Sequence, residues 1–233
     1  MFNIGTIKNQ FYKDFLDGFL ITEISRQDIN VVLNNLQHQY QEQAEVLIII
    51  AWACGSRPNE YLRLTPECFS RSKEFLEIKF PSSKGSSART ISMPRYIKNT
   101  NEEDPLTKKV FEYSRKLFPK QYLFWFFRSD AIRDGVIKRY KKKDGTIVEK
   151  KYDKIYNQLS SKLNYYFPKW FDCLFPDGVP PYYLRHNRAT KVYEKVGSGG
   201  TMETFGWKKE ETMRKYTHKT KKMRREIAAG LME

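Results

Sequence analysis

The sequence lacks the features of a membrane-spanning, metal-binding or disulfide-stabilised protein. Its 233 residues include only three cysteines and three histidines, all far apart. Because Cys54, Cys68 and Cys173 form no Cys-x-x-Cys pair, we expect reduced thiols and an intracellular, cytoplasmic location. The longest apolar run, residues 46–53, is too short to span a bilayer, and no signal-peptide pattern precedes it. We therefore predict no membrane partner, no bound metal and no other cofactor.

Positive charge is what the chain has in excess. Lysine and arginine total 42 residues against 27 for aspartate and glutamate, which gives a formal net charge of +15. A surplus of this size favours a polyanionic partner. An anionic membrane surface is the alternative, but no segment has the clean apolar face of an interfacial helix. With 40% hydrophobic and 15% aromatic residues to form a core, the sequence predicts a folded protein that binds nucleic acid.

The periodicity of apolar residues predicts a mostly α fold with a small antiparallel β-sheet, an α+β class. Ser25 with Asp28 makes a capping box for the first helix. A β-hairpin is expected from strands 74–80 and 88–93, with Lys84 in its polar turn. An aromatic strand is expected at 122–127 and a turn at 201–205. The expected helices are 27–37, 41–54, 58–64, 106–118, 156–167, 182–196, 210–216 and 220–232.

A second hairpin is expected at residues 138–154. Asp144-Gly145 between two β-prone arms is a strong turn signal. Taken alone, its charges would be a solvated face. Beside a phosphate-binding site they would more readily follow a DNA backbone, so we predict DNA contacts from Lys138, Arg139, Lys141, Lys142, Lys143, Lys150 and Lys151.

Four short motifs follow one another along the chain. The first is Gly55-Ser56-Arg57-Pro58-Asn59-Glu60, and the second is Ser83-Lys84-Gly85 in the first hairpin. The third is Pro181-Tyr182-Tyr183-Leu184-Arg185-His186, and the fourth is Gly206-Trp207 with Tyr216 nine residues later. Any one of them occurs by chance, but their order and spacing together are informative.

In order and spacing these motifs resemble those of the tyrosine recombinases, the phage-integrase family, from about residue 27 to the C-terminus. The resemblance implies a catalytic domain over residues 26–233, preceded by a lead-in segment at 1–25. It also implies double-stranded DNA as partner. The basic tail at 219–233 would dock on a neighbouring subunit of a homo-oligomer, a tetramer on DNA. Two positions depart from the family, because Tyr182 and Trp207 stand where histidine is usual.

The resemblance also implies a role for each motif residue. Arg57 and Arg185 would hold the non-bridging oxygens of a phosphodiester with bidentate, charge-assisted bonds. Tyr216 would attack the phosphorus to give a 3′-phosphotyrosine, and Lys84 would protonate the leaving 5′ hydroxyl. Neither metal nor ATP is needed. The supporting roles, stabilising the phosphate or orienting its ligands, fall to Tyr182, Trp207, Glu60 and His186.

Three functions fit these residues. The first is a site-specific recombinase or integrase of a virus, plasmid or other mobile element, or a chromosome-resolving relative. The second is a type IB topoisomerase-like enzyme, which uses the same chemistry to relax supercoils. The third is a non-catalytic DNA-binding relative. Because the nucleophile, arginines and lysine are all present, the third is disfavoured, and the basic tail favours the first.

Overall fold

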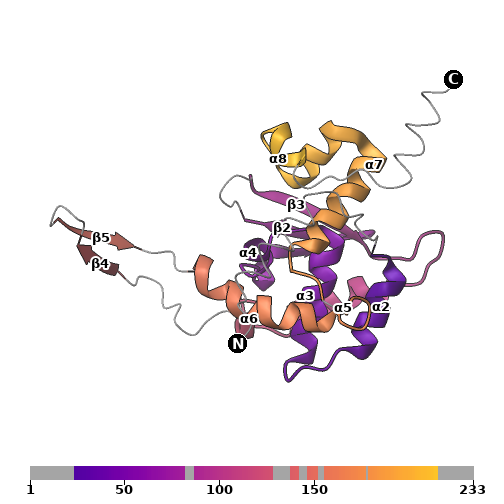
Figure 1. The fold of residues 1–233 in the computed structure, drawn as a ribbon. Coiled ribbons are helices and arrows are strands. Elements are labelled where there is room, and N and C mark those ends of the chain that lie inside the picture. The colour runs from indigo at the N-terminus through magenta and orange to yellow at the C-terminus, as the bar shows by residue number, and fades with distance from the viewer. Residues whose placement is uncertain are drawn as a thin grey trace.

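The computed structural model describes residues 24–81, 87–127, 137–141, 146–151, 155–176 and 178–214. Two predicted site residues, Lys84 and Tyr216, lie outside these ranges, as do Lys142, Lys143 and the expected tail helix. Helices make up most of the described fold (Figure 1). Their bounds are α2 Arg26–Asn35, α3 Gln41–Cys54, α4 Pro58–Tyr61, α5 Pro105–Arg115, α6 Ile155–Trp170, α7 Tyr183–Phe205 and α8 Glu210–Arg214.

Helix α3 forms the centre of the core. Apolar residues occupy nearly all of its faces, and a helix of that kind has to be covered on every side. Residues from Val46 to Ala51 are accordingly buried, and α3 packs against α2, α5 and α7. Its bounds are the predicted ones, and it ends at Gly55, which adopts the left-handed conformation.

Side-chain caps fix where two helices begin. Ser25 accepts a hydrogen bond from the N–H of Asp28, whose carboxylate accepts one from the Ser25 N–H, so the predicted capping box is confirmed. Asp104 accepts from the N–H groups of Leu106 and Thr107 at the start of α5. Asp104 also pairs with Arg26 at the start of α2, which joins the two helix starts.

A three-stranded antiparallel sheet lies beside the helices. Its order is β1–β2–β3, with bounds Phe69–Arg71, Phe75–Phe80 and Arg89–Pro94. Strands β2 and β3 are the predicted hairpin, and β1 is an additional strand that the sequence did not reveal. Alternate residues of β2 (Leu76, Ile78 and Phe80) are buried, as expected where one face covers a core. The register pairs Phe80 with Arg89 and brings the start of β3 against α3 and α7.

Two predicted elements differ from the structure. Residues 122–127 form turns and a short 3₁₀ helix, η2 (Trp125–Phe127), instead of a strand. Phe124 and Phe127 are both buried there, a spacing of three that suits a tight helical turn better than an alternating strand. The expected turn at 201–205 is helical and forms the end of α7. The chain breaks instead at Gly197, where φ is +68°.

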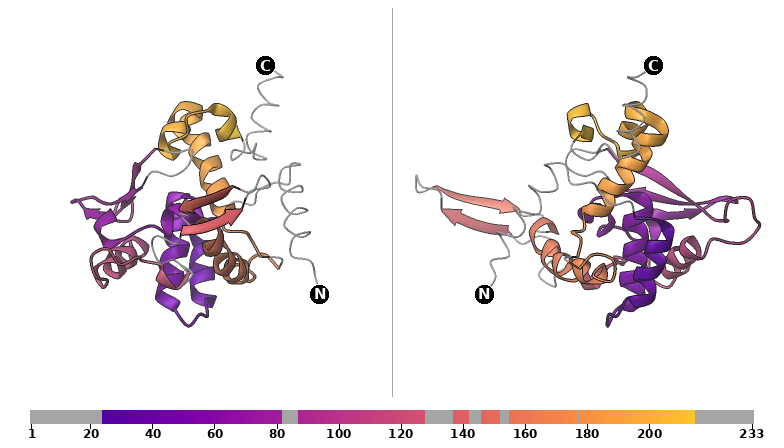
Figure 2. Two further views of the ribbon diagram at one scale, coloured as in Figure 1. Left: turned by 90° about the vertical axis from the view of Figure 1, so that its left-hand side faces the viewer. Right: turned by 45° about the vertical axis from the view of Figure 1, so that its right-hand side comes forward.

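The second predicted hairpin is a two-stranded ribbon that stands apart from the body (Figures 1 and 2). Strand β4 (Ile137–Lys141) pairs antiparallel with β5 (Ile147–Lys151). The register sets Lys138 opposite Lys150.

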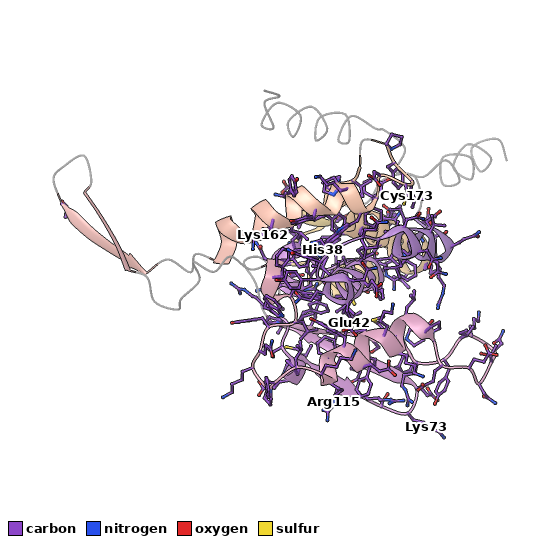
Figure 3. All side chains as sticks on the ribbon, turned by 90° about the horizontal axis from the view of Figure 1, so that it is seen from below. His38, Glu42, Lys73, Arg115, Lys162 and Cys173 are labelled. Carbon is purple, nitrogen blue, oxygen red and sulfur yellow. The ribbon has the colours of Figure 1, made fainter. Side chains whose placement is uncertain are left out.

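An aromatic cluster anchors the base from which the ribbon extends. The His38 ring lies 5.2 Å from Phe126, 4.7 Å from Tyr166 and 5.7 Å from Trp170, measured between ring centroids. Burial lowers the pKa of His38. Lys162 on α6 donates to the Phe126 carbonyl at 3.2 Å. Figure 3 shows His38 and Lys162 on this side of the body, away from Lys73.

Candidate active site

The turn between α3 and α4 presents Arg57. Gly55 reverses the chain with φ of +56°, and Arg57 is extended just before Pro58 opens α4. A Cβ at Gly55 would lie 2.8 Å from the Cβ of Arg188 and 3.0 Å from Cε1 of Phe205. Both the positive φ and the close approach of α7 therefore require glycine. The Arg57 side chain is 16% exposed, so part of it remains accessible to solvent.

The first turn of α7 supplies Arg185, whose side chain is fully buried. Its Nη1 donates to the Gly55 carbonyl at 2.8 Å, which ties α7 to the turn that holds Arg57. The guanidinium lies 5.0 Å from the ring centroid of Phe205 and 5.1 Å from that of Trp207. These two rings stack on each other, with centroids 4.8 Å apart. Trp207 therefore supports Arg185 through a cation–π contact.

A single buried carboxylate joins the two predicted arginines. Oε1 of Glu60 accepts from Nη1 of Arg57 at 3.1 Å, and Oε2 accepts from the Arg57 backbone N–H at 2.9 Å. Nη1 of Arg185 lies 3.8 Å from Oε2 of the same carboxylate. Glu60 has no exposed side-chain surface. The motif residues Arg57, Glu60, Arg185 and Trp207 are thus brought together from distant parts of the chain.

Arg89 is a third arginine at this carboxylate, and the sequence reasoning assigned it no role. It opens β3, and its Nη2 donates to Oε2 of Glu60 at 2.7 Å and to Oγ of Ser56 at 3.4 Å. Its guanidinium lies 5.2 Å from the ring centroid of Phe80. A signal was present, since Arg89 closely follows the lysine motif at the start of a half-buried strand. We call Arg57, Glu60, Arg89 and Arg185 the arginine–glutamate cluster.

The charges of this cluster dominate its electrostatics. Burial alone would raise the pKa of Glu60, but its hydrogen bond to Arg89 and the charges of Arg89 and Arg185 lower it well below the usual range. The carboxylate is therefore ionised at neutral and mildly acidic pH. Burial raises the pKa of Cys54 to about 12 despite the nearby charges of Arg188 and Arg89, so this thiol stays protonated.

The other predicted residues in the described ranges are Tyr182, His186 and those of the ribbon. Tyr182 is half-buried directly before α7, and its carbonyl accepts from the N–H of His186, which is buried. Burial, reinforced by Tyr182, raises the pKa of the neighbouring Tyr61 well above its usual value. The ribbon residues Lys138, Arg139, Lys141, Lys150 and Lys151 lie on β4 and β5, away from the cluster (Figure 1).

Metal-binding and membrane-spanning features are both absent from the described residues. Within them, histidine, cysteine, aspartate and glutamate form no group of three or more that could hold a metal ion. In the same part of the chain, no helix has the length and apolar character needed to cross a membrane.

The described body is mostly helical, carries a three-stranded antiparallel sheet and holds paired arginines on a buried glutamate. The sequence model of the phage integrase family matches residues 23–223, so the chain belongs to that family. No curated protein matches the sequence significantly. The fold predicted from the sequence is confirmed by similarity to solved tyrosine recombinases.

Three solved structures illustrate that similarity. The XerH site-specific recombinase, in a post-cleavage complex with its palindromic difH substrate, has a TM-score of 0.61 at 17% identity. The match covers 92% of this chain and 54% of XerH. XerA recombinase has a TM-score of 0.58 at 15% identity, over 92% of this chain and 66% of XerA. The Tn1549 transposon integrase, bound to transposon right-end DNA, has a TM-score of 0.50 at 14% identity, over 93% and 68%. This chain spans between about half and two thirds of these proteins.

Proposed function

We propose that this chain is a site-specific recombinase or integrase that cleaves and rejoins DNA strands through a 3′-phosphotyrosine. The observation that carries the proposal is the convergence of Arg57 and Arg185 on Glu60. Guanidiniums held by a buried carboxylate, a backbone carbonyl and aromatic rings are fixed before substrate arrives. Such preorganised donors stabilise developing charge far better than mobile ones do.

The chemistry follows from where charge moves. The phenol of Tyr216 gives its proton to water, and its oxygen attacks phosphorus to form the new P–O bond. The bond to the 5′ oxygen breaks, and Lys84 gives that oxygen a proton so that it leaves as a neutral hydroxyl. The 5′ hydroxyl of another strand reverses the steps and restores the phosphodiester. One phosphoester replaces another at each stage, so no external energy source is consumed.

Tyr182 and Trp207 take supporting roles in this proposal. A phenol at Tyr182 can donate a hydrogen bond to a phosphate oxygen but lacks the near-neutral proton exchange of an imidazole. Trp207 acts through Arg185, because its ring contacts that guanidinium. His186, buried on α7, helps to fix the helix start.

Double-stranded DNA is the proposed partner, bound by a homo-tetramer whose subunits exchange the tail at 219–233. The formal charge of +15 supports a polyanionic partner. A two-stranded ribbon fits the width of the DNA major groove. The ribbon of β4 and β5 would lie along that groove, with its cations following the phosphate backbone. The XerH and Tn1549 proteins, which share the fold, were solved with DNA.

Selection of covalent adducts tests the function without requiring a known target sequence. The protein is incubated with duplexes that carry a randomised segment and a nick, and DNA that stays attached to protein in detergent is sequenced. We expect wild type to enrich a defined site, and Tyr216→Phe to enrich none while it still binds DNA. Tyr193→Phe is the matched control, because Tyr193 is a half-buried phenol that packs on the small core around Trp207. Enrichment that survives in Tyr216→Phe would contradict the assignment of the nucleophile.

Two further measurements separate this function from its alternatives. Adducts should form in excess EDTA, whereas strict dependence on added magnesium would indicate a nuclease. Relaxation of supercoiled plasmid without any joining of two different duplexes would favour the topoisomerase-like function instead.

A further inference from the structure

We propose that Arg89 is a positioning residue for strand transfer, which holds Glu60 in place and thereby sets the directions of Arg57 and Arg185. This inference rests on the proposed function and adds a residue to its machinery. It starts from the 2.7 Å hydrogen bond between Nη2 of Arg89 and Oε2 of Glu60, which is shorter than the 3.1 Å bond from Nη1 of Arg57 and the 3.8 Å approach of Arg185.

Arg89 holds the side of Glu60 that faces both other arginines. Oε2 accepts the backbone N–H of Arg57 and lies near Nη1 of Arg185. Without Arg89, the carboxylate would keep its bonds to Arg57 but lose the 2.7 Å hydrogen bond that opposes a shift toward the remaining cations. Because a displacement of about 1 Å in a reacting group can cost on the order of 100-fold in rate, a small rotation would suffice to misdirect the guanidiniums.

Arg89 is enclosed by its neighbours. Its side chain is 6% exposed. Nε and Nη1 of Arg89 are buried and have no hydrogen-bond partner among the described residues, while Nη2 is used by Glu60 and Ser56. The Phe80 ring lies along the guanidinium. Arg89 is therefore packed as a support behind the carboxylate.

The fork of arginine is what this position uses. Nη2 reaches two acceptors, Glu60 and Ser56, while the planar group lies against an aromatic ring. A lysine would keep the charge but would lose this geometry. Arg89→Lys and Arg89→Met therefore separate the contribution of the fork from that of the charge.

The experiment measures adduct formation in single turnover and DNA affinity in parallel, on the site enriched by wild type. We expect Arg89→Lys and Arg89→Met to slow adduct formation about 100-fold, with DNA affinity within about twofold of wild type. Arg71→Met is the control, because Arg71 also pairs with a carboxylate, Glu103, but on the partly exposed β1. It should leave the rate unchanged. DNA affinity that falls as much as the rate would make Arg89 a phosphate ligand and overturn the proposal.

A double-mutant cycle tests whether Arg89 acts through Glu60. In a Glu60→Gln background, Arg89→Met should slow adduct formation by less than about threefold further, since the group that it positions has already lost its charge. Equal effects in both backgrounds would show that Arg89 acts by another route. Arg89→Lys keeps this test available if Arg89→Met fails to fold.

If wild type forms no adduct, the proposed function is contradicted, but the positioning role of Arg89 can still be tested by spectroscopy. The Nε–Hε resonance of Arg57 in ¹⁵N NMR reports the environment of its guanidinium. We expect it to move in Arg89→Lys and to stay in place in Arg71→Met. A resonance unchanged in Arg89→Lys would overturn the positioning role.

Discussion

Replacing Glu60 with glutamine should reveal how much of the folded state depends on one buried carboxylate. The substitution keeps the size of the side chain but removes the charge that Arg57, Arg89 and Arg185 share. Removing one partner of a buried ion pair costs about 3–5 kcal/mol, because the remaining charge stays buried. Three guanidiniums would then repel one another without the negative charge of Glu60 between them. We expect the free energy of unfolding at pH 7 to fall by about 3 kcal/mol or more.

The pH dependence of that loss has a definite sign. The pKa of Glu60 is lowered in the folded state, whereas in the unfolded chain it is about 4.3. The stabilisation is therefore fully present above about pH 4.3 and is lost as the pH falls toward the folded pKa. At about 1.36 kcal/mol for each pH unit, the difference between wild type and Glu60→Gln should shrink by about 1.8 kcal/mol between pH 7 and pH 3.

Urea unfolding at the two pH values provides the measurement. Glu103→Gln is the matched control, because Glu103 also lies between two arginines, Arg71 and Arg95, but is partly exposed. Its loss at pH 7 should be much smaller than that of Glu60→Gln. A Glu60→Gln loss below about 1 kcal/mol, or one that is equal at pH 3 and pH 7, would refute the reasoning.

Three other predictions address the turn, the acid and the ribbon. Gly55→Ala should lower the free energy of unfolding by roughly 2–4 kcal/mol, because of its positive φ and the overpacking against α7; a decrease below about 1 kcal/mol in a thermal melt would mean that the turn relaxes. Lys84→Ala should cleave normal DNA slowly, yet cleave a substrate with a 5′-bridging sulfur at nearly the wild-type rate, since that leaving group needs no proton. Equal impairment on both would remove Lys84 as the acid. Alanine at Lys141, Lys142 and Lys143 should weaken binding to target and random DNA alike. It should also flatten the slope of log affinity against log salt by roughly 0.9 for each phosphate that is no longer neutralised. Weakened binding to the target alone would show that these lysines read bases.

Much of the fold could be predicted because local signals were strong. The apolar run and the glycine that follows it marked both ends of α3, and the capping box marked the start of α2. The failures came where packing outweighed local pattern. Residues 122–127 have strand-forming aromatics, but Phe126 and Phe127 pack beside His38 in a tight turn. The helix predicted over 182–196 does end at the break at Gly197, but the chain then returns to helix through Phe205 where a turn was expected.

The candidate site was only partly accessible to sequence reasoning. Arg57 and Arg185 stand in recognisable motifs, and the spacing of Glu60 after Arg57 indicated that it would orient a basic group. Arg89 was missed because its role depends on the register that sets the first residue of β3 beside that carboxylate. The lysine motif before Arg89 singled out this part of the chain, but only the folded structure shows that Arg89, among 42 basic residues, reaches the buried acid.

The arginine–glutamate cluster has a consequence for how tightly DNA is held. Three guanidiniums and one ionised carboxylate give it a net charge of +2. An intact phosphodiester carries one negative charge, whereas the state formed by attack of a phenolate carries two. The cluster therefore matches the reacting phosphate in charge more closely than the resting one, and only such differential binding raises the rate. In the proposed reaction, Glu60 would cancel one positive charge and so keep the arginines from binding uncleaved DNA more tightly than the reacting state.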